Sequence, residues 1–371
     1  MNQQNRPVRI LISGGGTGGH IFPALSIANA LRRRLPECEI LFVGAIGRME
    51  MERVPAAGYR IEGLPVAGFD RKRLWRNFGV LVKLWKSMRK ARRIVKDFAP
   101  DAAVGVGGYA SGPVLKEAQR RGIPTLIQEQ NSYAGVTNKL LAPRAMAICT
   151  AYEGMERFFP ADRITLTGNP VRKELTQCAL TQAEAKKNLG FNPEKPLIFV
   201  TGGSLGARTV NDATAAMLQK LQEAGIQLLW QTGRLYEKEC TAKAADYPQV
   251  KASAFISDMA TAYRGADLVV ARAGAGTISE LQLLGKAALL IPSPNVAEDH
   301  QRRNAEALVE HGAAVMLLDA EAVERLGEEA TRLVADKEKL SKLSGAAAAM
   351  AMTDSDEKIT DTLLSLINTG K

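Results

Sequence analysis

A sequence pattern that occurs twice constrains this fold more than any other feature. Short apolar runs typical of buried strands alternate with helical stretches, and the alternation starts again at residues 195–200, "KPLIFV". In each half the first apolar run leads into a glycine-rich turn, "SGGGTGG" at 13–19 and "TGGSLGAR" at 201–208. Strands that alternate with helices are typical of parallel sheets. We therefore expect the α/β class, with two Rossmann-like parallel-sheet domains that face each other across a cleft.

The chain of 371 residues is long enough for two such domains, each with its own core. A break between them is expected near "TLTGNPVRKEL", where Asn169 precedes a proline. The pattern predicts an N-terminal domain over residues 1–169 and a C-terminal domain over residues 170–352. A C-terminal helix at about residues 353–371 is expected to pack back onto the first domain.

Composition excludes several classes of protein. The four cysteines form no CxxC pair, which argues against zinc sites and against a secreted disulfide framework. No run approaches the roughly 20 apolar residues that a bilayer span needs. We therefore expect reduced thiols, no metal site and no membrane-crossing segment.

The net charge of +10 is concentrated in one stretch. Between Asp70 and Asp97, eleven Lys or Arg stand against two Asp, and apolar residues recur at helical spacing. This pattern predicts a basic amphipathic helix. Its cations suit anionic lipid headgroups or nucleic acid; the alternative is a solvated face on a helix whose apolar stripe covers a sheet.

The first glycine turn contains the GxGxxG spacing of dinucleotide-binding folds at Gly14, Gly16 and Gly19. The next strand-like run, however, ends without the acidic residue that would hold a ribose in such folds. What remains is a turn that lets the main chain approach a phosphate, followed by a helix expected near residues 22–35 whose start favours anions. The alternative is a tight strand-to-helix connection without a ligand.

Further polar segments follow other strand-like runs and should reach the same sheet edges. In the first half these are "GVGGYASGP" at 105–113 and "QEQNSYAGVTNK" at 128–139. In the second half "RAGAGTISE" at 272–280 is expected to open a helix. Glu280, one turn into it, either holds ribose hydroxyls or only complements the helix dipole. His20, beside the first turn, is a candidate general base near neutral pH, or else caps the helix or contacts a phosphate.

Together, these segments with "GNPVR", "TGGSLGAR" and "DHQRRNA" resemble the MurG family of GT-B glycosyltransferases over nearly the whole chain. That family adds N-acetylglucosamine to an undecaprenyl-diphosphate-linked N-acetylmuramoyl peptide. The resemblance implies a GT-B fold, UDP-N-acetylglucosamine (UDP-GlcNAc) as donor, lipid I as acceptor, and lipid II and UDP as products formed with inversion. Another GT-B sugar-nucleotide transferase with a different acceptor is the alternative.

Carried over position by position, the resemblance implies a donor site at Thr17, Gly18, Gly19, Asn131, Arg172, Ser204, Ile256, Ala275, Gly276, Thr277, Ile278, Ser279, Glu280 and Gln301. It implies an acceptor or diphosphate side at Gly14, Gly15, Gly16, Gly108, Tyr109, Ser111 and Gly112. In this scheme the main chain of Ile256 meets uracil, Glu280 takes the ribose, and Arg172 and Ser204 contact the donor phosphates.

The only Asp-x-Asp match, residues 354–356, lies far along the chain from any glycine turn. We therefore expect no metal and no cofactor, with amides, a helix dipole and Arg172 stabilising the leaving UDP, and we assign His20 as the base.

A polyprenyl-linked acceptor turns the segment from Arg71 to Arg93 into a peripheral docking surface at the cytoplasmic face of the cell inner membrane. Cell-wall synthesis proteins are further candidate partners, whereas nucleic acid is not expected, because binding it would leave the two glycine turns without a purpose. A dinucleotide oxidoreductase is not expected either, because the chain lacks the carboxylate that would hold the ribose.

Overall fold

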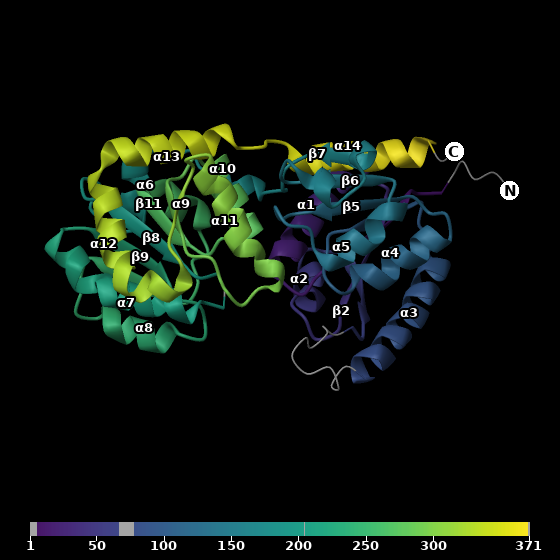
Figure 1. Cartoon of the computed structure of the whole chain (residues 1–371), viewed down its shortest axis with the longest axis horizontal. Coiled ribbons are helices and arrows are strands. Elements are labelled where there is room, and N and C mark those ends of the chain that lie inside the picture. The colour runs from purple at the N-terminus through teal and green to yellow at the C-terminus, as the bar shows by residue number, and fades with distance from the viewer. Residues whose placement is uncertain (1–5, 67–77, 204, 370–371) are drawn as a thin grey trace. The chain divides into compact units, whose positions relative to one another are not determined.

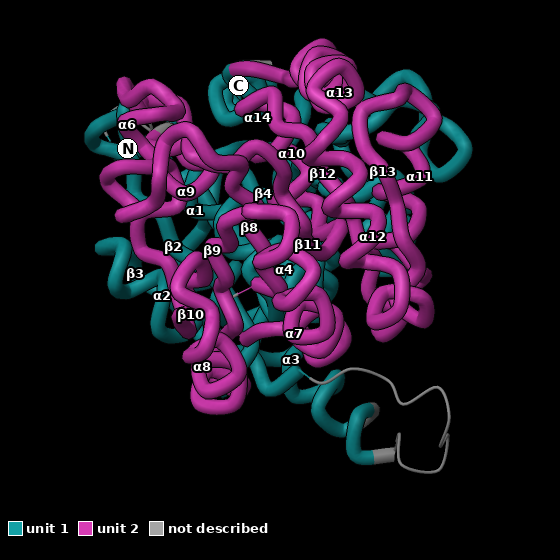
Figure 2. The backbone as a smooth tube through the Cα atoms, turned by 90° about the vertical axis from the view of Figure 1, so that its left-hand side faces the viewer, with its two compact units in different colours: residues 1–171, 354–371 teal, residues 172–353 magenta. Residues whose placement is uncertain are grey.

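The computed structural model describes residues 6–66, 78–203 and 205–369. The chain divides into two compact units: unit 1 comprises residues 1–171 and 354–371, and unit 2 comprises residues 172–353 (Figure 2). The boundaries expected from the sequence lie at residues 169 and 352. Within the described ranges, no helix is both long enough and apolar enough to cross a membrane.

Unit 1 is built on a parallel sheet with the strand order β3-β2-β1-β4-β5-β6-β7. Figure 1 labels β2, β5, β6 and β7 of this sheet. Its strands are β1 (Arg9–Ser13), β2 (Glu39–Ala45), β3 (Arg60–Leu64), β4 (Ala102–Gly105), β5 (Thr125–Glu129), β6 (Ala147–Thr150) and β7 (Ile164–Leu166). Its helices are α1 (Gly18–Arg34), α2 (Glu50–Ala56), α3 (Phe78–Phe98), α4 (Ser111–Arg120), α5 (Val136–Leu141) and α14 (Ser355–Thr369). Short 3₁₀ turns occupy Ala142–Arg144, Met155–Arg157 and Ala161–Arg163.

Both faces of this sheet are covered, because successive side chains of a strand point to opposite faces. Ile10 and Ile12 of β1 pack in one core with α1 and α14. Leu11 packs on the other face in a core with α3, α4 and α5. Strands buried on both faces must be apolar throughout, which explains the continuous apolar runs in the sequence.

Unit 2 repeats the architecture with the strand order β10-β9-β8-β11-β12-β13, again all parallel. Its strands are β8 (Leu197–Thr201), β9 (Gln227–Gln231), β10 (Val250–Ser253), β11 (Leu268–Ala271), β12 (Ala288–Leu290) and β13 (Val315–Met316). Its helices are α6 (Gln182–Asn188), α7 (Arg208–Glu223), α8 (Glu237–Ala244), α9 (Met259–Gly265), α10 (Ala275–Leu283), α11 (His300–Glu310), α12 (Ala322–Ala335) and α13 (Lys337–Ala349). Short 3₁₀ turns occupy Lys173–Leu175, Ala297–Asp299 and Asp319–Glu321.

Two expected helices have different bounds. The helix expected near residues 22–35 begins earlier, at Gly18, because Thr17 is the last extended residue (φ −145°) and the final glycines of the turn already belong to the helix. The basic helix expected within residues 71–93 is α3, which runs on to Phe98; residues 71–77 lie outside the described residues. The fold class predicted from the sequence, two parallel Rossmann-like sheets, is confirmed.

The strand order of each sheet reverses once, and this reversal positions the candidate sites. In unit 1 the chain steps outward from β1 to β2 on one side and to β4 on the other. In unit 2 the corresponding neighbours of β8 are β9 and β11. Parallel α/β sheets bind ligands beyond the carboxyl ends of the strands at this reversal point. Both glycine turns, after β1 and after β8, lie there.

The last helix, α14, packs within unit 1 although it follows unit 2 in the sequence. Ile359 and Leu363 are fully buried in the core that α1 shares with the sheet. At its start, Asp356 and Glu357 form ion pairs with Arg33 of α1 at 2.8 and 2.6 Å. The single Asp-x-Asp match of the chain therefore serves to attach α14 to α1.

Leu363→Ala is expected to lower the free energy of unfolding of the chain by about 2–5 kcal/mol, because it leaves a cavity in this core. Urea denaturation followed by circular dichroism measures the change. Asn368→Ala, an exposed position on the same helix, is the control and should change stability by less than about 0.5 kcal/mol. Equal midpoints for Leu363→Ala and the wild type would mean that α14 does not stabilise unit 1.

Candidate functional site

In unit 1 the first glycine turn and the segment after β4 meet main chain to main chain. Gly15 has a φ of +141° and Gly108 a φ of +83°, which side-chain-bearing residues rarely adopt. A Cβ on Gly108 would collide with the carbonyl oxygen of Gly15. Ser111 closes the second segment, since its hydroxyl donates to the Gly108 carbonyl at 2.9 Å, while Tyr109 beside it is exposed. The expectation that both segments reach one sheet edge is confirmed.

A buried carboxylate lies directly behind this turn. Glu50, the first residue of α2, is 1% exposed. Its oxygens accept the N–H of Gly16 at 3.0 and 3.1 Å and the N–H of Ala45 at 2.9 Å. The Gly16 amide, one of those expected to face an anion, is therefore directed inward. Anion binding at this turn must use the amides that follow, at the first turn of α1, where a helix leaves N–H groups unpaired.

His20 is held by the same turn from the other side. Its Nδ1 lies 3.1 Å from the Gly15 carbonyl oxygen and 3.2 Å from the Thr17 hydroxyl. A Cβ added at Gly107 would come within about 3 Å of His20 Nε2, so the ring packs against the segment after β4. A donor bond from Nδ1–H to the Gly15 carbonyl leaves Nε2 as the proton acceptor of the neutral ring.

The loop after β5 is organised by a second buried carboxylate, Glu129. It accepts four N–H donors at 2.8–3.2 Å: the main-chain and side-chain nitrogens of Asn131, the main-chain nitrogen of Gly135 and the side-chain nitrogen of Asn138. Gln130, next to it, donates to the Val106 carbonyl at 2.9 Å and so ties this loop to the segment after β4. Asn131, expected in the donor site, is held by this arrangement.

In unit 2 the site expected for the donor is centred on Glu280 of α10. Arg172 donates to Glu280 Oε1 at 3.1 Å, and the Tyr263 hydroxyl donates to Oε2 at 2.9 Å. Burial raises the pKa of Tyr263, and the neighbouring Glu280 carboxylate raises it further, so the hydroxyl stays protonated and keeps donating. Two residues expected to contact different parts of one ligand, Arg172 and Glu280, thus pair with each other.

Amide side chains hold the remaining loops at this edge. Buried Gln231 accepts the Ile256 N–H at 3.0 Å and donates to the Thr201 hydroxyl at 2.9 Å. Gln301 accepts the N–H of Ser293 at 2.9 Å. The Ile256 N–H is therefore already hydrogen-bonded, and the uracil ring could contact this residue only through its other main-chain atoms.

The residues expected from the sequence fall into two groups. Thr17, Gly18, Gly19 and Asn131 belong to unit 1, together with every residue of the expected acceptor side. Arg172, Ile256, residues 275–280 and Gln301 belong to unit 2. Ser204 lies outside the described residues. No group of three or more His, Cys, Asp or Glu suited to a metal ion occurs in the described part of the chain.

Sequence reasoning did not single out Glu50, Glu129, Gln231 or Tyr263. Glu129 and Gln231 stand in or just after strands, where the polar residue in an apolar run was the available signal. Glu50 and Tyr263 carry no such signal, because the contacts that matter here join Glu50 to Gly16, 34 residues away, and Tyr263 to Glu280, 17 residues away.

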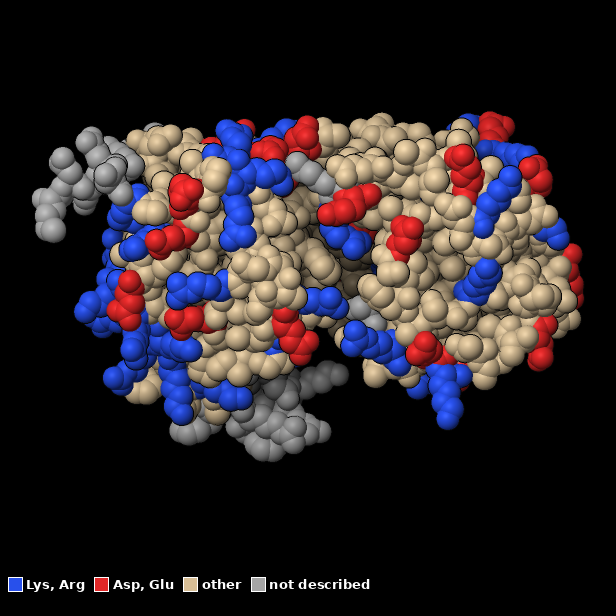
Figure 3. Space-filling view, turned by 180° about the vertical axis from the view of Figure 1, so that it is seen from behind, with Lys and Arg blue, Asp and Glu red and all other residues tan. Residues whose placement is uncertain are grey.

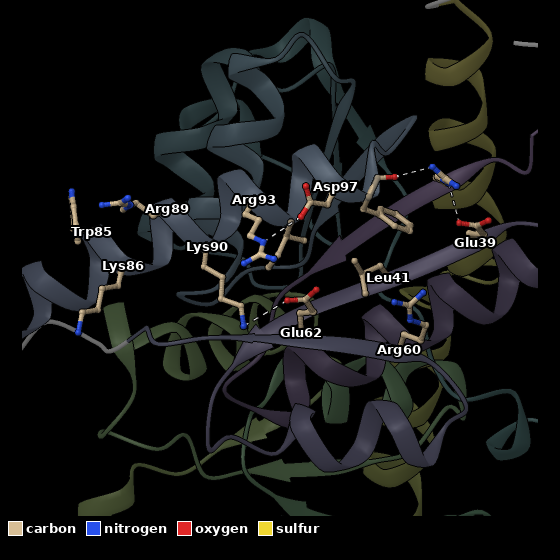
Figure 4. A pocket seen from close by; sticks show the side chains of 13 residues that line it. Glu39, Leu41, Arg60, Glu62, Trp85, Lys86, Arg89, Lys90, Arg93 and Asp97 are labelled. Carbon is tan, nitrogen blue, oxygen red and sulfur yellow. Dashed lines mark hydrogen bonds and ion pairs between the residues drawn. The ribbon is translucent and has the colours of Figure 1, made fainter. Parts of the chain in front are cut away.

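A second candidate site lies on the α3 side of unit 1. Cationic side chains of Lys86, Arg89, Lys90 and Arg93 line a groove between α3 and the β2–β3 edge of the sheet (Figure 4). Lys90 donates to the Gly63 carbonyl of β3 at 2.9 Å, whereas Arg93 is 84% exposed along its side chain. Lys and Arg side chains gather on the side of unit 1 that carries α3, at the left of Figure 3.

Two parallel Rossmann-type sheets, each with a glycine turn at its reversal point, define the GT-B class of fold. The family model "Glycosyltransferase family 28 N-terminal domain" matches residues 10–150, and "Glycosyltransferase family 28 C-terminal domain" matches residues 197–359. The chain belongs to glycosyltransferase family 28.

Relatives and solved structures narrow this further. Proteins named UDP-N-acetylglucosamine--N-acetylmuramyl-(pentapeptide) pyrophosphoryl-undecaprenol N-acetylglucosamine transferase are 59% identical in Phocaeicola vulgatus, covering 94% of this chain and 93% of the relative, and 52% identical in Porphyromonas gingivalis, covering 100% and 98%. The crystal structure of Acinetobacter baumannii MurG superposes with a TM-score of 0.77 at 29% identity, covering 97% of this chain and all of that one. The chain is thus a member of the MurG family within family 28, and the family predicted from the sequence is confirmed.

Glu129→Gln is expected to destabilise unit 1 by about 2 kcal/mol, because an amide nitrogen would face N–H donors that now meet a carboxylate oxygen. Hydrogen exchange should quicken across residues 130–138, which mass spectrometry resolves. Glu156→Gln, at an exposed position further along the chain, is the matched control. Unchanged exchange in Glu129→Gln would show that the carboxylate does not order this loop.

Proposed function

We propose that this chain transfers N-acetylglucosamine from UDP-GlcNAc to lipid I, with inversion at the sugar, giving lipid II and UDP. The observation that carries the proposal is its 59% identity, over nearly its full length, to a transferase named for this reaction. The Rossmann sheets support it, since each ends in a turn suited to a phosphate-bearing ligand.

Unit 2 takes the uridine and the diphosphate of the donor in this proposal, while Thr17, Gly18, Gly19 and Asn131 of unit 1 keep their expected role toward the rest of the donor. Glu280 accepts hydrogen bonds from the ribose hydroxyls, and the Tyr263 hydroxyl fixes the orientation of the Glu280 carboxylate. When the donor binds, Arg172 leaves Glu280 and donates to the donor diphosphate instead. A guanidinium binds such a group through paired N–H donors. As the bond from the sugar to the diphosphate breaks, UDP gains negative charge, and Arg172 with the start of α10 stabilises it.

Unit 1 takes the acceptor. The first turn of α1 and the segment after β4, residues 106–112, bind the lipid diphosphate and the adjoining sugar. His20 Nε2 removes the proton from the acceptor hydroxyl as its oxygen attacks the anomeric carbon of the donor. One bond to that carbon forms while the bond to UDP breaks, so the configuration inverts. A GT-B transferase acting on a different acceptor remains the alternative.

The reaction predicts that label passes from UDP-GlcNAc to a short-chain lipid I analogue when both are incubated with the purified chain. Transfer should continue in EDTA, because Arg172 and helix dipoles are assigned the role of neutralising the leaving group. His20→Ala should lower kcat roughly 10²- to 10⁴-fold, the usual contribution of a general base. Chromatography of the labelled disaccharide product measures both.

No transfer by the wild-type chain to a competent acceptor would contradict the function itself. Transfer by His20→Ala within about threefold of the wild type would contradict only the role of the imidazole. A change of acceptor that restores transfer would favour the alternative GT-B activity.

We further propose that α3 docks the chain on the anionic surface of the membrane that carries lipid I, at the cytoplasmic face of the inner membrane. The helix carries seven Lys or Arg and one Asp, and Val82, Leu84 and Trp85 are exposed on it. Arg89 stacks over the Trp85 ring at 4.7 Å. Exposed apolar and aromatic side chains among cations are what interfacial helices present to headgroups. Proteins of cell-wall synthesis are candidate partners at the same surface.

Flotation with vesicles tests this docking. The wild-type chain should bind vesicles containing an anionic phospholipid more tightly than neutral ones and lose this preference as salt rises. Reversing Lys86, Arg89 and Arg93 to Glu should weaken binding about a hundredfold or more, at about 1 kcal/mol per cation. Reversal of three exposed lysines of unit 2, Lys187, Lys220 and Lys238, is the matched control. Equal losses in the two triple variants would rule out a specific role for α3.

A further inference from the structure

We propose that Glu50 is a positioning residue for the reaction: it acts on His20 through the peptide group that joins Gly15 to Gly16. The inference rests on the proposed function, in which His20 Nε2 is the base. No contact between Glu50 and a substrate is involved.

The place of Glu50 is built into the fold. The side chain is 1% exposed and reaches under the turn from the start of α2. Its carbon chain occupies the space beside Gly44 of β2, where a Cβ would collide with it, and its carboxylate occupies the space beside Gly15. Two positions without side chains thus make room for one buried acid. A buried carboxylate is costly unless it is hydrogen-bonded, and here the N–H groups of Ala45 and Gly16 supply those bonds.

The peptide group between Gly15 and Gly16 connects Glu50 to His20. The Gly16 N–H and the Gly15 carbonyl are the two ends of one peptide group, which is planar and trans. Glu50 holds the N–H end at 3.0 Å, and the carbonyl end therefore points the opposite way, to within 3.1 Å of His20 Nδ1. Both residues flanking this peptide have positive φ, so the sequence of the turn alone does not select the orientation.

Two consequences follow for the imidazole. A carbonyl held at this position accepts Nδ1–H, which selects the tautomer with its lone pair on Nε2. The negative charge on the N–H end polarises the peptide group and makes its carbonyl a better acceptor, as in hydrogen-bonded chains. The Thr17 hydroxyl, 3.2 Å from Nδ1, supports the ring but accepts or donates equally well and does not select a tautomer.

Glu50→Gln tests the inference with little change in volume. The glutamine oxygen, in the place of Oε1, can still accept from Ala45 and from Gly16 at 3.1 Å. Its NH₂ group, in the place of Oε2, then faces the Gly16 N–H as donor against donor, and the negative charge is lost, so the peptide group is held less firmly. We expect kcat to fall at least about tenfold, while the KM for UDP-GlcNAc stays within about twofold, because the uridine and the diphosphate of the donor are assigned to unit 2. Glu52→Gln, an exposed acid on the same helix, is the matched control and should retain wild-type kcat.

A double-mutant cycle separates positioning from general support of the fold. If Glu50 acts through His20, Glu50→Gln should cost almost nothing further in a His20→Ala background. Thermal unfolding and calorimetric binding of UDP to the intact chain report on folding. Should Glu50→Gln not fold, Glu50→Asp, which keeps the charge on a shorter side chain, replaces it in the same cycle and should show a smaller loss that again vanishes without His20.

Wild-type kcat in Glu50→Gln, or an equal loss with and without His20, would overturn the inference and leave the proposed function intact. The proposed function fails differently: the wild-type chain then transfers no sugar to a competent acceptor, whatever residue 50 is. Transfer by His20→Ala at the wild-type rate would contradict the role of the imidazole, and with it this inference, but not the function.

Discussion

Main-chain contact at the carboxyl edge of the first sheet is the constraint on which the rest of unit 1 depends. The turn after β1 and the segment after β4 approach so closely that Gly108 has no room for a Cβ against the Gly15 carbonyl. Such an approach requires parallel neighbouring strands, since only then do both connections leave from the same edge. It brings His20, which follows the turn, against the segment that follows β4. The site is therefore a product of strand order before it is a product of any side chain.

Carboxylates that accept several hydrogen bonds are a second feature that organises the loops. Glu50 and Glu129 are almost fully buried and accept main-chain or amide donors from loops, and Glu280 accepts Tyr263 and Arg172. A loop that needs several N–H groups turned inward is well served by an acceptor-only group, which cannot swing round to donate. The corresponding amide at each of these positions would place an NH₂ donor where an N–H or O–H donor now meets an oxygen. In each unit, then, acids organise loops that are assigned to anionic substrates.

Charge is distributed in a way that reconciles these acids with anionic ligands. Glu50 and Glu129 face inward, where main-chain and amide N–H groups donate to them, while the starts of helices favour anions. The cationic side chains of α3 lie on a different element from the glycine turns and stand beside exposed apolar residues. Docking on the membrane surface and recognition of the lipid diphosphate are thus assigned to separate parts of unit 1.

The sequence by itself determined the class of fold and indicated where along the chain the candidate sites lie. Apolar runs such as "ILIS" and "LIFVT" predict strands buried on both faces, and a glycine turn after the first strand of each half predicts where a ligand binds, because both signals are local. It also predicted His20 and Glu280 as functional candidates. Only the tertiary structure decided that Glu50 lies beneath residues 15 and 16, that Tyr263 orients Glu280, and that the Asp-x-Asp segment serves α14. These pairings join residues 17 to more than 300 positions apart. Hydrogen bonds across such separations depend on strand order and helix placement, which no local pattern in the sequence encodes.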